Sequence, residues 1–245
     1  VRGELKSRLI MEKHAVLQLR RDILFHQSRY RVVSLGMNCW PKYLFMQAGW
    51  LESYNESDFY PLDQAFHLDF DRTLDALENQ FADYAEYISY TDNQVTRRFG
   101  RPTNGVTNSK YVGLLTHEGR NSTQNSLFYK QLAGNYQQLV KADNGELKVF
   151  VLLDLHNSLA ARQIDRFFEI MELQKVENFV LVLLMFDHPT FRYRHERVLV
   201  VNCVQGGKLR EYKWHNAHDV LFSQAAVKEF SREFGEIKLF ISKWI

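Results

Sequence analysis

Cys39 is the residue of this chain best placed to do chemistry. It ends the segment Arg31-Val-Val-Ser-Leu-Gly-Met-Asn-Cys39, and Pro41 follows closely. The apolar residues predict a buried strand, Gly36 permits a tight turn, and Pro41 suits the first turn of a helix. Free N–H groups and the dipole at a helix N-terminus favour thiolate over thiol. The pattern therefore predicts a cysteine nucleophile; a buried cysteine that only fills the core is the alternative.

A thiol nucleophile needs a base that moves protons, and usually a third group that orients the base. His117 follows an apolar segment, so it is predicted at a strand end and is one candidate base. Asp63 or Glu118 would orient it, although a loop aspartate such as Asp63 also caps turns. His218, immediately before a predicted helix, is the other candidate base. Either histidine would complete a site for acyl transfer.

The residues next to the cysteine are candidates for stabilising a reaction intermediate. Backbone N–H groups from Asn38 to Trp40, together with the Asn38 amide, are predicted to form an oxyanion hole. Trp40 and Glu118 are predicted to border the substrate.

Residues 91–109 are rich in Asn, Thr, Arg, Gly and Pro, which predicts a mobile loop or lid. The segment carries Arg97, Arg98 and Arg101, and guanidinium groups bind carboxylates and phosphates well. These arginines are predicted to bind an anionic substrate or the phosphates of an acyl-coenzyme A donor. A solvated loop without a ligand is the alternative, and no other cofactor is expected.

Strands and helices alternate along most of the chain. Apolar runs predict strands, and apolar residues spaced three and four apart predict helices. The strands are predicted at residues 32–35, 111–117, 147–154, 179–186, 198–204 and 237–241, and the helices at 71–88, 125–141, 158–173 and 219–234. Pro61 predicts an extended segment over 59–63. The alternation predicts an α/β fold of three layers, a mostly parallel sheet with helices on both faces.

Ligands of open parallel sheets collect beyond the carboxyl ends of the strands. The residues that follow predicted strands are therefore expected along one edge: Cys39, His117, His156 and the Asp187-His188 pair. Asp154 and His156, with Asp187-His188, are residue types that bind metals. Strand-end residues of this kind more often form hydrogen bonds with neighbouring loops, and no metal is predicted.

Three short segments match the signature of a known family. They are Ser34-Leu-Gly-Met-Asn-Cys39, Tyr60-Pro-Leu-Asp63 and Thr116-His117-Glu118. They resemble the S-L-G-x-N-C, P-F-D-W and H-D-F motifs of a bacterial family labelled papain-like cysteine peptidase. The resemblance spans about residues 31–155 and implies a cysteine enzyme, with Cys39 as the nucleophile and His117 as the preferred base.

A looser resemblance concerns the late histidine. A histidine before the last helix, facing a nucleophile after the first strand, is similar to the layout of SGNH esterases and acetyltransferases, with Cys39 in place of their serine. This resemblance implies His218 as the base and an O-acyltransferase that acts on a carbohydrate or polysaccharide. The order strand, turn, cysteine, helix predicts an α/β sheet rather than the papain fold.

The composition is that of an ordinary globular protein: 245 residues, of which 45% are hydrophobic and 24% charged. The net charge of +2 predicts no nucleic-acid partner. No apolar run reaches the about 18 residues of a membrane span. The two cysteines, Cys39 and Cys203, form no disulfide framework or zinc motif, which predicts a reducing, cytoplasmic location and no structural metal.

Residues 1–28 are predicted to form an amphipathic helix that packs on a neighbouring domain or a second copy, and 29–245 a single α/β domain. Together the patterns predict a cysteine-dependent acyl-transfer enzyme, either hydrolase (peptidase-like) or acyltransferase, that acts on a small-molecule or carbohydrate substrate. The alternative is a non-catalytic module that binds carbohydrate or protein through aromatic residues such as Trp40 and Trp214.

Overall fold

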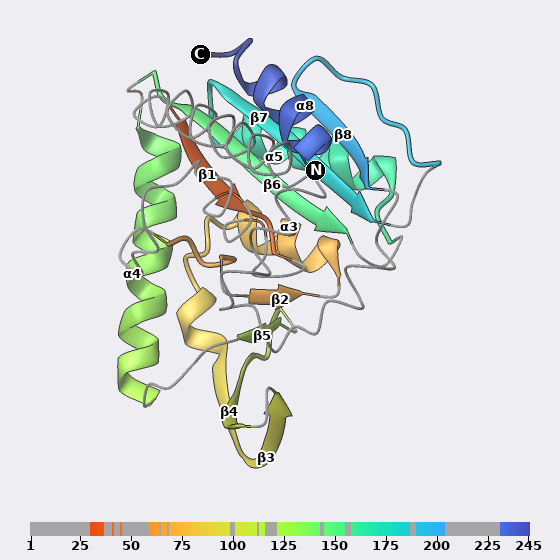
Figure 1. Ribbon diagram of the computed structural model, residues 1–245. Coiled ribbons are helices and arrows are strands. Elements are labelled where there is room, and N and C mark those ends of the chain that lie inside the picture. The colour runs from red at the N-terminus through yellow and green to blue at the C-terminus, as the bar shows by residue number, and fades with distance from the viewer. Residues whose placement is uncertain are drawn as a thin grey trace, which may run out of the picture.

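Figure 1 shows the chain in a computed structural model. The structure describes residues 30–36, 41, 45, 59–63, 65–67, 69–98, 101–111, 113–115, 122–142, 145–154, 158–186, 190–203 and 231–245. The predicted N-terminal helix over residues 1–28 lies outside this part of the chain.

A parallel sheet forms the centre of the fold. Its described strands are β1 (Tyr30–Ser34), β6 (Leu147–Asp154), β7 (Phe179–Phe186) and β8 (Val198–Cys203), in the order β1-β6-β7-β8. All three pairings are parallel. Every residue of β6 is buried, as expected of a strand that is covered on both faces. The continuous apolar runs therefore predicted these strands correctly.

Helices cover both faces of this sheet (Figure 1). One face packs against α3 (Phe70–Glu78), α4 (Ser122–Lys141) and α5 (Ala161–Leu173). The other face packs against α8 (Ser231–Ile241) and Phe45. Along β6, Phe150 and Leu152 point to the first face, whereas Val149 and Val151 point to the second. The predicted three-layer α/β fold is confirmed.

A second, antiparallel sheet adjoins the first and was not predicted. Its order is β2-β5-β4-β3, formed by β2 (Ala65–His67), β5 (Gly113–Leu115), β4 (Arg101–Asn108) and β3 (Ile88–Arg98). The prediction of a loop or lid over 91–109 is therefore wrong, since β3 and β4 form a hairpin there. The prediction that 111–117 adds a strand to the parallel sheet is also wrong. Polar residues dominate β3 and β4, so no apolar alternation marks them as strands.

Two other predicted elements differ from the structure. Residues 237–241 are not a strand but the second half of α8, because Ile237, Phe240 and Ile241 recur at helical spacing and are buried on the sheet. The helix predicted over 71–88 ends at Glu78. It ends there because Gln80 and Phe81 adopt φ angles of 54° and 57°, which no α-helix accommodates. A short 3-10 helix, η3 (Tyr84–Tyr87), follows.

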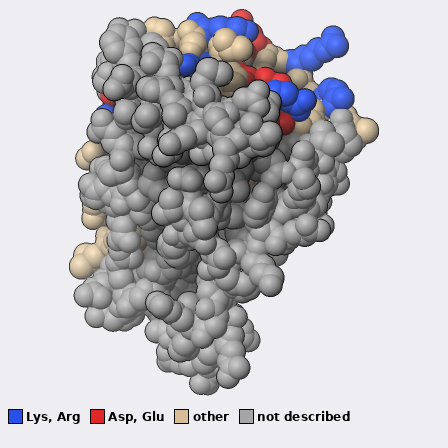
Figure 2. Space-filling model, viewed as in Figure 1, with Lys and Arg blue, Asp and Glu red and all other residues tan. Residues whose placement is uncertain are grey.

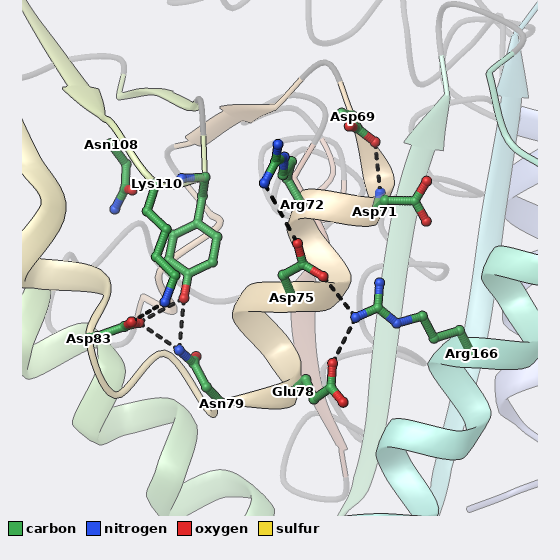
Figure 3. Close-up of polar contacts among 11 residues, drawn as sticks. Asp69, Asp71, Arg72, Asp75, Glu78, Asn79, Asp83, Asn108, Lys110 and Arg166 are labelled. Atoms are coloured by element: carbon green, nitrogen blue, oxygen red, sulfur yellow. Dashed lines mark hydrogen bonds and ion pairs between the residues drawn. The ribbon is translucent and has the colours of Figure 1, made fainter.

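A polar cluster ties the second sheet to the end of α3 (Figure 3). The carboxylate of Asp83 accepts hydrogen bonds from Lys110 Nζ, from Tyr111 Oη at 2.7 Å and from Asn79 Nδ2 at 2.6 Å. Burial by itself raises the pKa of Asp83, but these hydrogen bonds and the charge of Lys110 outweigh it, so the pKa lies below its usual value. Burial and the bond to Asp83 raise the pKa of Tyr111 to about 12.

Because of this cluster, the free energy of unfolding is expected to change with pH in the acidic range. Because the pKa of Asp83 is lower in the folded chain than in the unfolded one, its stabilisation is present above the ordinary aspartate value of about 4 and disappears as the pH falls through the folded value. We expect Asp83→Asn to lower the free energy of unfolding at neutral pH, and its difference from the native chain to shrink in acid. Urea unfolding at several pH values measures this difference. Glu169→Gln, at an exposed position of α5, is the control; a constant difference between native chain and Asp83→Asn would contradict the prediction.

Candidate functional site

The chain turns sharply where β1 ends. Ser34 is fully buried; its N–H donates to Asp63 Oδ1 at 3.2 Å, and its hydroxyl accepts from Gly36 N at 3.3 Å. Leu35 N still donates to Val151 O at 2.9 Å, so the main chain leaves the sheet at the next residue. Gly36 has a φ of 79°, a conformation that glycine adopts without strain. The predicted strand and glycine turn are confirmed.

A helix follows within a few residues of that turn. Pro41 and Phe45 are helical, and Phe45 is fully buried in the core on the α8 face. Asn38, Cys39 and Trp40 lie outside the described residues. The described elements on either side of Cys39 are therefore those that a thiolate at a strand–turn–helix junction requires.

Asp63 fastens a turn to the end of β1. Its carboxylate is buried, and in addition to Ser34 N it accepts from Tyr60 N at 2.8 Å through Oδ2. Asp63 N donates in return to Tyr60 O at 3.0 Å, which closes the turn. Residues 61–63 are a buried turn and not the extended segment that Pro61 predicted. Asp63 thus caps a turn, the alternative considered from the sequence, and a role in orienting a base stays a prediction.

The pairing of β2 with β5 relates Asp63 to the segment that carries His117. The two strands are antiparallel, with Ala65 opposite Leu115. Asp63 precedes Ala65 by two residues, and His117 follows Leu115 by two. The end of β5 that leads to His117 is therefore paired with the start of β2, which Asp63 precedes. His117 and Glu118 themselves lie outside the described residues.

The structure corrects the reason for which His117 was expected near Cys39. That reason was a shared edge of one parallel sheet, but β5 belongs to the antiparallel sheet. The hydrogen bond between Ser34 and Asp63 and the pairing of Ala65 with Leu115 connect the two segments instead.

The other predicted site residues are on the β3–β4 hairpin, at the end of β6 or outside the described residues. Arg97 and Arg98 are at the end of β3, and Arg101 is at the start of β4. The remaining candidates lie outside the described residues: His156, Asp187, His188 and His218. Asp154 is buried at the end of β6, and its Oδ2 accepts from Ser158 N at 3.1 Å and Leu159 N at 3.0 Å, which confirms a hydrogen-bonded strand-end residue. The described residues include no group of three or more metal-binding side chains.

Sequence reasoning missed Ser34 as a partner of Asp63. The two residues are 29 positions apart, and nothing local connects them. The bond uses the backbone N–H of Ser34, which every residue type except proline has, so the side-chain types gave no signal for it.

The described surface mixes charges of both signs. On the face in Figure 2, the basic and acidic side chains that are coloured lie interspersed near one end of the molecule. On α8, for example, Arg232 pairs with Glu233 at 3.0 Å and with Glu236 at 3.8 Å. Among the helices that the structure describes, none has the length and apolar character needed to cross a membrane.

Comparisons with protein-family models, with curated proteins and with solved structures find no match. The resemblance of residues 31–155 to the papain-like cysteine peptidase family stays a prediction.

Proposed function

We propose that the chain is a cysteine-dependent acyl-transfer enzyme, with Cys39 as the nucleophile and His117 as the base. One observation carries the proposal: Asp63 is bonded to the end of β1, which leads to Cys39, and it precedes β2, whose partner β5 leads to His117. The end of β1 thus contacts this buried carboxylate, and the end of β5 pairs with the strand that begins two residues after it. A nucleophile, a base and an orienting carboxylate are the groups that acyl transfer by a thiol requires.

The chemistry follows from these roles. His117 takes the proton of Cys39, and the thiolate attacks the acyl carbon to give a tetrahedral intermediate. Backbone N–H groups around Asn38 to Trp40 stabilise its oxyanion. The carbon–leaving-group bond then breaks, and His117 returns the proton to the leaving group. Water or a hydroxyl attacks the thioester with His117 as the base, which releases the product and restores the thiol.

The substrate class follows from the reaction. A thiolate accepts acyl groups from thioesters such as acyl-coenzyme A, from esters, and from peptides. The acceptor is water in a hydrolase and a sugar hydroxyl in an O-acyltransferase. A reducing compartment such as the cytoplasm keeps Cys39 in the thiol form that this cycle needs.

The pH dependence of alkylation by iodoacetamide tests the proposal. We expect Cys39 to react well below the pH of a free thiol, whose pKa is about 8.5, because an imidazolium partner and a helix N-terminus both stabilise the thiolate. His117→Ala is expected to move the reaction of Cys39 to higher pH, whereas His218→Ala leaves it unchanged. Mass spectrometry of the labelled peptides reports each cysteine separately.

Cys203 provides the internal reference for this experiment, since it is part of β8, opposite Phe186 of β7. Should Cys39 react no faster than Cys203 at any pH, the proposal fails. A shift with His218→Ala and none with His117→Ala would replace His117 by His218 as the base, in the layout of the SGNH enzymes.

A further inference from the structure

The hairpin of β3 and β4 has an outer part that consists of two strands alone. Within β4, only Val106 to Asn108 pair with β5. The outer ribbon, which we define as residues 96–98 and 101–103, continues beyond that contact and has no third strand in the described sheet. Figure 1 shows this end of the hairpin below β5, on the side of the second sheet that faces away from the parallel sheet.

The outer ribbon is cationic and polar. Its six residues are Thr96, Arg97, Arg98, Arg101, Pro102 and Thr103, so it contains three positive charges and no acidic or large apolar residue. The whole chain has a net charge of only +2. The chain average, which predicts no nucleic-acid partner, therefore hides a local excess of positive charge.

The strand register distributes the arginines over both faces of the ribbon. Arg98 is directly opposite Arg101, so these two positions share one face. Arg97 is opposite Pro102, at the next position along the strand, and belongs to the other face. Facing residues of an antiparallel pair have Cβ atoms about 4.5–5.5 Å apart, and like charges there destabilise the pair.

The same features argue against a strand as the partner. β3 is the edge of the second sheet, and its register shifts between Thr91 and Thr96. The arginines and the irregular register of β3, and Pro102 in the part of β4 that β5 does not pair with, disfavour the addition of another strand. A small anion also fits poorly, because it can contact the positions on only one face of the ribbon.

We propose that the outer ribbon binds the phosphate backbone of a nucleic-acid duplex. A duplex has phosphates on both walls of its grooves, which matches arginine positions on both faces of the ribbon. The major groove of DNA, about 12 Å wide, admits a two-stranded ribbon. This site is independent of Cys39 and of the acyl-transfer reaction.

Binding of a labelled DNA duplex of about 20 base pairs, measured by fluorescence anisotropy between about 50 and 200 mM salt, tests the proposal. The variant with Arg97→Gln, Arg98→Gln and Arg101→Gln is expected to bind at least about ten-fold more weakly. The slope of log affinity against log salt should fall by about three, close to one for each lost phosphate contact. Lysine at the same three positions keeps the charges and should retain most of this slope.

The matched control removes three positive charges elsewhere, through Lys130→Gln, Arg162→Gln and Arg194→Gln, all at exposed positions. It is expected to bind the duplex as the native chain does. An equal loss in the control, native affinity in the first variant, or no duplex binding by the native chain would overturn the proposal. Arginine-dependent binding to phosphatidylserine vesicles without binding to the duplex would overturn it in favour of a membrane surface.

Circular dichroism and the thermal midpoint show whether each variant is folded. If the triple glutamine variant unfolds, Arg98→Gln alone removes one member of the facing pair. This single change is expected to lower the salt slope by about one, and an unchanged slope would overturn the proposal.

Discussion

Asp63→Ala is expected to lower the free energy of unfolding by about 2–4 kcal/mol, because two backbone N–H groups lose their acceptor. These groups belong to Ser34, which is buried, and to Tyr60, which is partly buried. The variant is also expected to abolish the reaction of Cys39 at low pH, since the turn at Tyr60 and the end of β1 are no longer held together. Urea unfolding measures the first effect, and alkylation of the folded variant measures the second.

Asp154→Ala separates the two effects. Asp154 is as buried as Asp63, and it also accepts hydrogen bonds from two backbone N–H groups, but it does so at the end of β6. We expect a similar loss of stability with no change in the alkylation of Cys39. If both variants alter the reactivity of Cys39 equally, Asp63 acts on the cysteine only through the stability of the fold.

Phe167→Ala is expected to destabilise the chain by about 3–5 kcal/mol, the range for a buried aromatic residue cut back to alanine. Phe167 is fully buried between α5 and the sheet. Its ring lies 5.3 Å from that of Phe150 in β6 and 6.0 Å from that of Phe179 in β7, edge to face in both cases. The variant would leave a cavity beneath the two central strands, and urea or thermal unfolding measures its effect.

The neighbouring residue provides the control. Phe168 is only partly buried, and its ring contacts those of Phe179 at 5.5 Å and His195 at 4.2 Å. Phe168→Ala removes a ring of the same size from the next position of α5, with an expected cost of about 1–2 kcal/mol because less apolar surface leaves the core. Equal losses for the two variants would contradict the packing described for this face of the sheet.

The parallel sheet was predictable because each strand is marked in its own residues. A strand covered on both faces must be apolar throughout, and residues 147–154 and 179–186 are almost wholly so. The helices between them show helical spacing for the same local reason. Residues 237–241 were predicted to be a strand because they are rich in β-branched and aromatic residues. In the structure they are helical, and their apolar side chains pack on the sheet.

The second sheet was not predictable from such local signals. Polar strands such as β3 and β4 are stabilised by their pairing rather than by an apolar face, and the residue partners are chosen only when the chain folds. β2 and β5 are three residues each, too short for an apolar alternation to stand out.

For the candidate site too, the local features were predictable from the sequence and the contacts between distant segments were not. The sequence alone determined the local frame of Cys39: an apolar strand, a glycine that permits a positive φ, and a proline suited to a helix start. Only the tertiary structure decided that Asp63 is bonded to Ser34 and that Ala65 is opposite Leu115. The physical reason is that backbone conformation depends on neighbouring residues, whereas hydrogen bonds between distant segments depend on how the whole chain packs.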